Sequence, residues 1–408
     1  MRLLQEGVRE GYIIPTDITR KITMDGVTKV YQVYKIKLSC LYYNDQNDRI
    51  ATWISKYKAD NALENLEIYN REQYNNIIQQ FIIESNPSAI DRTKSNISMV
   101  DQREPGVVLN DGRIIDGNRR FTCLRLLATK DNHFDWFEAV VLDKDINNNQ
   151  KEIKMMELMI QHGEEGKVDY NPIDRLVGVY NDIIDKKLLT IAEYAKSTNE
   201  TESEVKKRIE LANLMVEFLD YINAPKQFYI ARELELEGPL IELVAILKKC
   251  PDDETRQKMK ISVFNNMLVK PENDITRFVR QIKSVVETEF LDDFIEEQID
   301  LAEQVAEIIP KQVENAKIIQ ENVRQNERIK EKLSHSMDKV VTKVKRVETR
   351  NKPAMMLEKS ILALESIDVH ILEKLEKEEL EVVRNKMEVI KEHLLKIEDS
   401  IQKKYSND

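Results

Sequence analysis

The chain contains few of the residues that interrupt regular structure and few that crosslink it. Of its 408 residues only 10 are glycine and 10 are proline, whereas 33% are charged and 41% are hydrophobic. This composition favours long helices joined by few irregular loops, and the length predicts two or three domains. The three cysteines, Cys40, Cys123 and Cys250, form no CxxC pair. Neither a disulfide framework nor a zinc site is therefore indicated.

A positive net charge and an apolar run of membrane length are also missing. The formal net charge is −11 and only 6% of the residues are aromatic. An acidic balance argues against a surface that coats nucleic acid, although it leaves room for local basic patches. Because neither a signal-peptide pattern nor a membrane-length segment is found, we expect a cytoplasmic protein with no membrane partner.

Residues 107–127 (VVLNDGRIIDGNRRFTCLRLL) form the most informative stretch of the chain. Val107–Leu109 is an apolar run, and the Asn-Asp-Gly sequence that follows is typical of a turn between antiparallel strands. A second turn comes next, and a helical pattern starts at Arg119. The stretch therefore predicts a short hairpin, a sharp turn and a helix.

Two adjacent arginines, Arg119 and Arg120, stand at the start of this helix, directly after Gly117 and Asn118. The N-terminus of a helix has backbone N–H groups without partners and a partial positive charge. Arginines at that position predict a phosphate-binding site. A structural alternative is that Arg120 pairs with a buried carboxylate such as Asp116.

Patterns along the rest of the chain predict an α+β domain followed by helices. Residues 29–41 and 137–142 have strand-like alternation, and residues 71–84 have helical periodicity between them. A polar segment at residues 143–150 indicates a boundary. Beyond it the patterns are helical throughout. We predict four domains, at residues 1–145, 146–220, 221–310 and 311–408.

The last predicted domain, residues 311–408, has the heptad-like spacing of a coiled-coil arm. A break at Thr349–Pro353 divides it into two long charged helices. We expect the arm to mediate self-association, giving a homo-oligomer, or to bind a protein partner. The apolar positions step by three and four residues; they are Leu333, Met337, Val340, Val344 and Val347, then Val383, Met387, Ile390, Leu394, Ile397 and Ile401.

A helix-turn-helix is predicted between residues 188 and 215. Its requirements are a small residue between the helices, a turn residue that tolerates positive φ, a cap and apolar anchors. The residues that meet them are Ala195, Asn199, Thr201 or Ser203, Val205 and Ile209.

The charges of this unit are mixed, so DNA binding and a purely structural helix pair are both open. The basic run Lys206, Lys207 and Arg208 could contact the DNA backbone, together with Thr201 and Ser203. Three glutamates at the same end, Glu200, Glu202 and Glu204, would be repelled by phosphates.

Three segments in this order resemble the ParB/sulfiredoxin-fold family, specifically ParB-like proteins with a helix-turn-helix. Leu41–Arg49 (LYYNDQNDR) resembles the first ParB box, and Gly117–Arg120 (GNRR) stands at the Gly-x-Arg-Arg phosphate box. Asp169–Leu176 (DYNPIDRL) is similar to the segment that precedes the ParB helix-turn-helix. The resemblance covers roughly residues 30–220 and implies an N-terminal ParB/sulfiredoxin-like domain.

The resemblance implies a nucleotide-binding fold that binds CTP or another NTP with Mg²⁺, closes around DNA and hydrolyses the nucleotide slowly. Arg119 and Arg120, with the Gly117 turn, would hold the triphosphate, and Arg49 would lie near it. Asn118 occupies the position of the catalytic cysteine of sulfiredoxin, so sulfiredoxin chemistry is not expected.

One expected element, a Glu-Asn pair for the metal, is missing ahead of the Asn-Pro segment. Glu164 or Glu165 could bind Mg²⁺ instead, because Mg²⁺ prefers carboxylate and phosphate oxygens. The alternative is a solvated acidic loop. Asp111 and Asp116 are the other acidic residues near the phosphate turn that could bind the metal, and Asp116, Glu164 and Glu165 are the candidate catalytic residues if the protein is an enzyme.

We therefore expect a ParB-like nucleotide-binding and DNA-binding protein of partition, regulation or phage and mobile-element biology. A second hypothesis is a ParB-like nucleotidase or nuclease of a bacterial defence or DNA-modification system. A third is a non-catalytic interaction scaffold.

Overall fold

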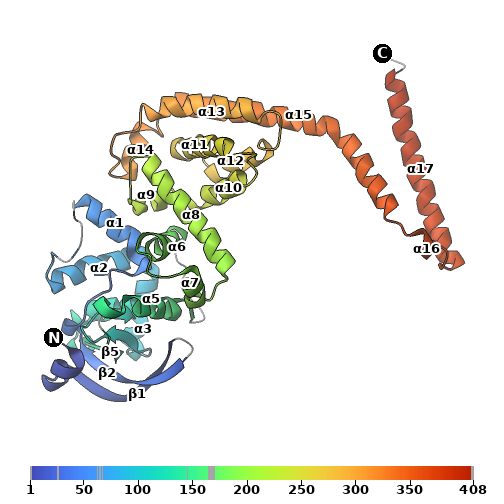
Figure 1. Ribbon diagram of the computed structural model, residues 1–408. Coiled ribbons are helices and arrows are strands. Elements are labelled where there is room, and N and C mark those ends of the chain that lie inside the picture. Colours follow the sequence, from blue (N-terminus) through green and yellow to red (C-terminus); the bar gives the residue numbers. More distant parts are fainter. Residues whose placement is uncertain are drawn as a thin grey trace. The chain divides into compact units, whose positions relative to one another are not determined.

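The computed structural model of the chain describes residues 2–24, 27–61, 63, 66, 68–144, 146–163 and 171–405 (Figure 1). The chain divides into two compact units, Met1–Val341 and Thr342–Asp408. None of the helices in the described residues is both long and apolar enough to cross a membrane.

A five-stranded mixed sheet with the strand order β1-β2-β5-β3-β4 opens the first unit. All neighbouring strands are antiparallel except β3 and β5, which are parallel. The strands are β1 (Ile13–Met24), β2 (Val27–Lys37), β3 (Gly106–Leu109), β4 (Ile114–Asp116) and β5 (Trp136–Leu142).

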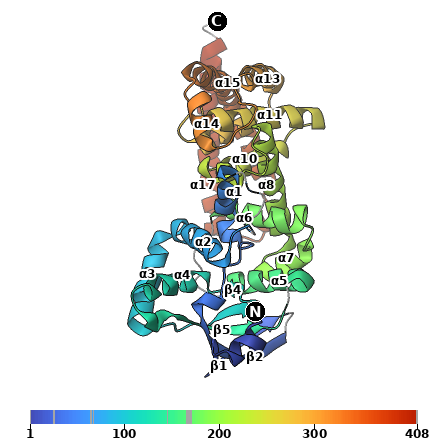
Figure 2. The ribbon, with the colours of Figure 1, turned by 90° about the vertical axis from the view of Figure 1, so that its left-hand side faces the viewer.

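Alternating side chains of the strands build a separate apolar core on each face of the sheet. Val108 and Ala139 belong to one core, and Val107 and Val140 belong to the other. Helices α1 to α4 contribute to the first core, and α5 covers the opposite face (Figures 1 and 2). These helices are α1 (Ala51–Asp60), α2 (Arg71–Ser85), α3 (Pro87–Val100), α4 (Asn118–Ala128) and α5 (Ile146–Gly163).

The strongest local patterns of this region are confirmed by the structure. The predicted strands correspond to β2 and β5, the predicted helix to α2, and the predicted hairpin to β3 and β4. Strand β1 was not predicted, because Pro15 interrupts its pattern. The structure places β1 at the edge of the sheet, with an irregularity in its register between Pro15 and Thr19, where a proline is tolerated.

Helices make up the remainder of the first unit, and the predicted domain boundaries after residues 145, 220 and 310 lie within this unit. Helix α10 packs against α12, and α11 packs against α13. The elements are α6 (Pro172–Val179), the π-helical turn η5 (Tyr180–Asp185), α7 (Ile191–Thr198), α8 (Glu202–Tyr221), α9 (Phe228–Glu233), α10 (Glu237–Leu247), α11 (Asp253–Val269), α12 (Ile275–Gln281), α13 (Leu291–Ala306), α14 (Ala316–Asn322) and the start of α15 (Glu327–Glu365).

The first part of the predicted coiled-coil arm belongs to this unit. Leu333, Met337 and Val340 on α15 are buried, and Ser336 accepts a hydrogen bond from Gln298 of α13 at 3.0 Å. The predicted break at Thr349–Pro353 does not end the helix, because α15 continues through Pro353. A single proline removes one helical hydrogen bond. In the second unit the chain continues through α16 (Val369–Leu372) to α17 (Lys377–Tyr405).

Candidate functional site

The turn before α4 requires a glycine for two reasons. Gly117 has φ 102°, in the left-handed region, and a Cβ atom there would lie 2.8 Å from the ring of Phe137. Helix α4 begins at Asn118, and its first internal hydrogen bond joins the N–H of Phe121 to the carbonyl of Gly117 at 2.9 Å. The N–H groups of the first helical residues therefore have no intrahelical partner.

The side chain of Arg120 forms hydrogen bonds that stabilise this turn. Its guanidinium donates to the Glu104 carbonyl at 2.7 Å and to Asp116 Oδ2 at 3.1 Å. Arg20 donates to the same carboxylate oxygen at 3.0 Å. The alternative that Arg120 pairs with Asp116 is therefore observed in the structure. Arg20 is a second arginine bound to the same carboxylate.

Arg119 is in a different situation. Among the described residues no group forms a hydrogen bond or an ion pair with its half-buried guanidinium. Burial lowers the pKa of Arg119, and the positive charges of Arg49, Arg120 and Arg92 lower it further, against a smaller opposite effect of Cys123. Its charged neighbours are thus cations, and a bound anion would relieve their mutual repulsion.

Arg49 reaches this cluster from the segment that resembles the first ParB box. Two successive asparagine turns shape the segment: Asn44 Oδ1 accepts the N–H of Gln46 at 3.1 Å, and Asn47 Oδ1 accepts that of Arg49 at 3.0 Å. Arg49 lies near enough to Arg119 for its charge to lower the pKa of Arg119, so two of the residues selected from the sequence are neighbours.

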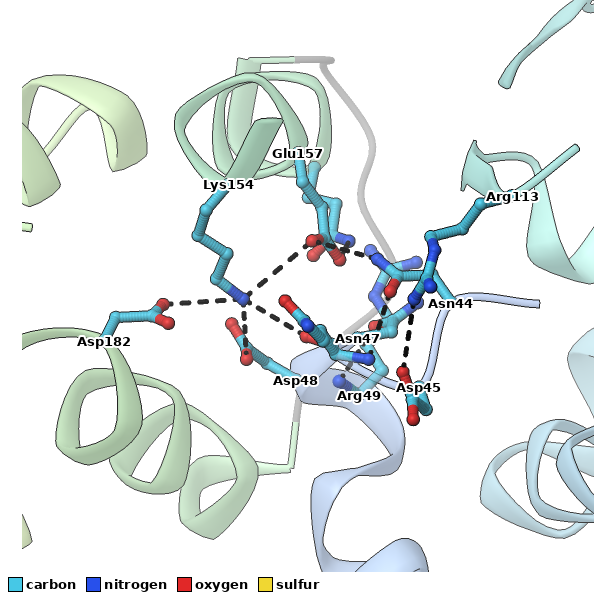
Figure 3. A network of polar contacts seen from close by, with 11 residues as sticks. Asn44, Asp45, Asn47, Asp48, Arg49, Arg113, Lys154, Glu157 and Asp182 are labelled. Atoms are coloured by element: carbon cyan, nitrogen blue, oxygen red, sulfur yellow. Dashed lines mark hydrogen bonds and ion pairs between the residues drawn. The ribbon is translucent and has the colours of Figure 1, made fainter. Parts of the chain in front are cut away.

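Directly beside Arg49, a buried network of polar contacts surrounds Lys154 of α5 (Figure 3). The Lys154 ammonium lies 2.9 Å from Asp48 Oδ1, 3.4 Å from Asp182 Oδ2 and 3.9 Å from Glu157 Oε2. Glu157 also accepts from Gln161 at 2.9 Å. One cation thus faces three carboxylates, and all four charged side chains are buried.

This imbalance shifts the pKa values of the network. Burial would lower the pKa of Lys154, but the three carboxylates outweigh it and raise the pKa well above the usual lysine value. Burial raises the pKa of Glu157 to about 7, against the effect of Lys154. The pKa of Asp182 is raised to about 7 for the same reasons.

Lys154, Glu157 and Asp182 were missed in the sequence. The available signal was a polar arc on α5, in which Lys154, Glu157 and Gln161 repeat at three and four residues between apolar neighbours. The partner Asp48 is 106 residues away from Lys154, and no local pattern connects the two.

The helix-turn-helix is confirmed as local structure. Asn199 between α7 and α8 has φ 56°, as the turn requires. Thr201 caps α8 in a reciprocal capping box with Glu204. Ala195 and Val205 are buried in one core with Leu158 of α5, and Ile209 packs against this core.

The residues selected for DNA contact differ in their availability. Arg208 donates twice to Glu200, at 2.5 and 2.7 Å, so it braces the turn. Lys206 has a single exposed ion pair with Glu202 at 3.8 Å, which is weak. Ser203 and Lys207 are exposed. Lys206 and Lys207 are therefore the basic side chains that this end of α8 presents.

The acidic residues considered for a metal site fall into two groups, two that the structure describes and two that it does not. Glu164 and Glu165 lie outside the described residues. Asp116 is bound by Arg20 and Arg120, and Asp111 accepts a hydrogen bond from Tyr42 at 2.5 Å. The part of the chain that the structure describes contains no group of three His, Cys, Asp or Glu side chains that could hold a metal ion. Asp111 and Asp116 thus already have partners within the chain, and Glu164 and Glu165 stay a prediction.

In comparisons with known proteins, no protein-family model and no curated protein matches the sequence of this chain. The resemblance to ParB-like proteins therefore rests on the three sequence segments alone.

Proposed function

We propose that the protein binds the phosphates of a nucleotide, CTP or another NTP, at the N-terminus of α4, and that binding is coupled to DNA contact by α7 and α8. The observation that carries the proposal is the half-buried Arg119 guanidinium, which has cationic neighbours and no counter-ion among the described residues. Partial burial of a charge is unfavourable unless the charge is paired. A phosphate group would provide that pair.

Each element of the turn has a separate role in this proposal. Arg119 and Arg49 bind the phosphate oxygens, and the N–H groups of Asn118 and Arg119 donate to them as at other helix N-termini. Gly117 allows the chain to enter the helix at this angle. Arg120 acts through Asp116 by fixing the turn, so it positions the site.

Helix α5 provides the physical connection to the helix-turn-helix. On one side Ile153 and Met156 pack in the core of the sheet. On another side Leu158 packs in the core that contains Ala195 and Val205. The polar arc between these sides holds Asp48, the neighbour of Arg49, through Lys154. A shift of Arg49 upon nucleotide binding would therefore act on the helix that supports α7 and α8.

Nucleotide binding is tested by calorimetric titration of the native chain with each of the four NTPs and Mg²⁺. We expect saturable binding of at least one. No binding of any NTP would remove the proposal.

DNA binding needs its own experiment, because it could fail while nucleotide binding holds. Substituting Lys206 and Lys207 together with Glu should abolish DNA retention on filters at low salt. The matched control replaces Lys374 and Lys377, which lie outside the first unit, with Glu and makes the same change in net charge. Unchanged retention in the first variant, or equal loss in both, would contradict the assignment to α8.

A further inference from the structure

Many apolar side chains of the second unit are exposed, and contacts within the unit do not cover them. No residue of α17 is buried, although a regular series of apolar residues runs along the helix. The exposed fraction of these side chains is 51% for Met387, 49% for Leu394 and 50% for Ile401. A helix of this length with one uncovered apolar face requires a partner.

The apolar series is a heptad seam, and its residue types indicate how many helices meet. Steps of three and four residues place Leu380, Met387, Leu394 and Ile401 at the first core position. The other core position is β-branched throughout, with Val383, Ile390 and Ile397. Unbranched-at-Cβ residues fill the first position except at Ile401. In parallel coiled coils, leucine at the first position with isoleucine at the second favours three- and four-helix bundles over two-stranded coils.

Helix α15 offers a second seam in the same unit, but it is too short to cover the first. After Pro353 its apolar series is Leu357, Ile361 and Leu364, and the last two are 54% and 44% exposed. Leu357 faces Ile397 and Ile401 across a groove of about 660 Å³. The two helices thus form a hairpin with a partly apolar groove between them.

We propose that two copies of this chain associate through these hairpins, α15 and α17 of each, and form a four-helix bundle. Two helices from each of two chains make four, which is one of the bundle sizes that this composition favours. Both positive and negative side chains lie beside the α17 seam, so the seam does not favour a partner with a net charge of one particular sign. In an antiparallel α17 pair that overlaps over its whole length, Arg384 of each copy faces Glu398 of the other. These two attractive pairs flank a repulsive contact of Lys391 with its own copy.

The test is the mass of the full chain in solution, measured by light scattering after size-exclusion chromatography. The native chain should give twice its 47.8 kDa. Ile390→Asp with Ile397→Asp should give the monomer mass. The control, Val389→Asp with Leu395→Asp, adds the same charges at exposed apolar positions of α17 outside the seam, and should remain a dimer.

Orientation is tested by charge exchange. Arg384→Glu should raise the dissociation constant of the dimer at least tenfold, and the additional substitution Glu398→Arg should restore the native value. A native monomer, whose hairpin has closed on itself, would overturn the proposal. So would a native mass of four chains, or a control variant that dissociates like the seam variant. Failure to bind nucleotide would leave this result untouched, because the two proposals concern separate units.

Discussion

Two clusters of charged side chains meet at the neighbouring residues Asp48 and Arg49, and they carry opposite charge excesses. Arg49 belongs to a cluster with an excess of positive charge, and Asp48 belongs to one with an excess of carboxylates. Around Arg119 the charged neighbours are cations, and among the described residues no carboxylate pairs with it. Around Lys154 three carboxylates face one ammonium, and all of these side chains are buried. The second cluster resolves its excess internally, because two of its carboxyl groups have raised pKa values. Arginine cannot release its proton in this way. The comparison therefore supports our proposal of ligand binding at the first cluster, and it predicts structural stabilisation by the second.

The largest expected effect comes from removing the Lys154 ammonium, the one cation that forms ion pairs with all three carboxylates of the second cluster among the described residues. Lys154→Met leaves the three carboxylates buried without a counter-ion, so the free energy of unfolding should fall by about 3–5 kcal/mol. Urea unfolding monitored by circular dichroism measures it. The matched control is Lys151→Met on the same helix, which loses a partly solvent-accessible ion pair with Glu193 and should cost less than about 1 kcal/mol. Equal losses in the two variants would show that the buried ion pairs of Lys154 contribute no more to stability than the ion pair of Lys151.

The next effect is a dependence on pH. The pKa of Glu157 is raised from 4.5 to about 7 in the folded chain. Its protonation therefore adds stability that is complete below about pH 4.5 and is lost as the pH rises through 7. Glu157→Gln avoids this loss. The free energy of unfolding of the variant minus that of the native chain should therefore increase by about 1–3 kcal/mol as the pH rises from 5 to 8. A difference that stays constant with pH would contradict the assignment.

The adjacent arginines of the first cluster should differ in their effect on stability. Arg120→Gln removes hydrogen bonds to Asp116 and Glu104, and should lower the free energy of unfolding by about 1–2 kcal/mol. Arg119→Gln removes a charge that lies among like charges, so stability should stay the same or rise by up to about 1 kcal/mol. Thermal unfolding of both variants without ligand distinguishes them. A loss of stability in Arg119→Gln as large as that in Arg120→Gln would give both residues a structural role.

The sequence predicts features that depend on neighbouring residues. The glycine turn, the start of α4 and the positive φ of Asn199 each follow from a few adjacent positions, and all three are observed. The sequence also offers Asp116 as a partner of Arg120, because the two are four residues apart. It cannot reveal that Arg20, 96 residues away, shares the same carboxylate.

Long-range contacts account for the rest. The Lys154 network joins the segment at Asp48 to α5 and to η5, and its members are recognisable only once the sheet and α5 have packed. The same limit applies to the coiled-coil positions, where identical spacing leads to different environments. Leu333 and Met337 are covered within the first unit, whereas Leu394 and Ile397 are exposed. Spacing predicts an apolar face, but only the fold shows what covers it.

The central claim is that Arg119 binds nucleotide phosphate, and a calorimetric comparison of single variants tests it most directly. The titration uses the NTP that the native chain binds best, with Arg119→Gln and with Arg125→Gln. Arg125 lies on the same helix and bonds to Glu72 and Asn76, so its variant controls for the loss of one positive charge. We predict that affinity falls about 30-fold to 100-fold for Arg119→Gln, which corresponds to about 2–3 kcal/mol for a charged hydrogen-bonding pair, and less than threefold for Arg125→Gln. Equal affinities for the two variants would contradict the account.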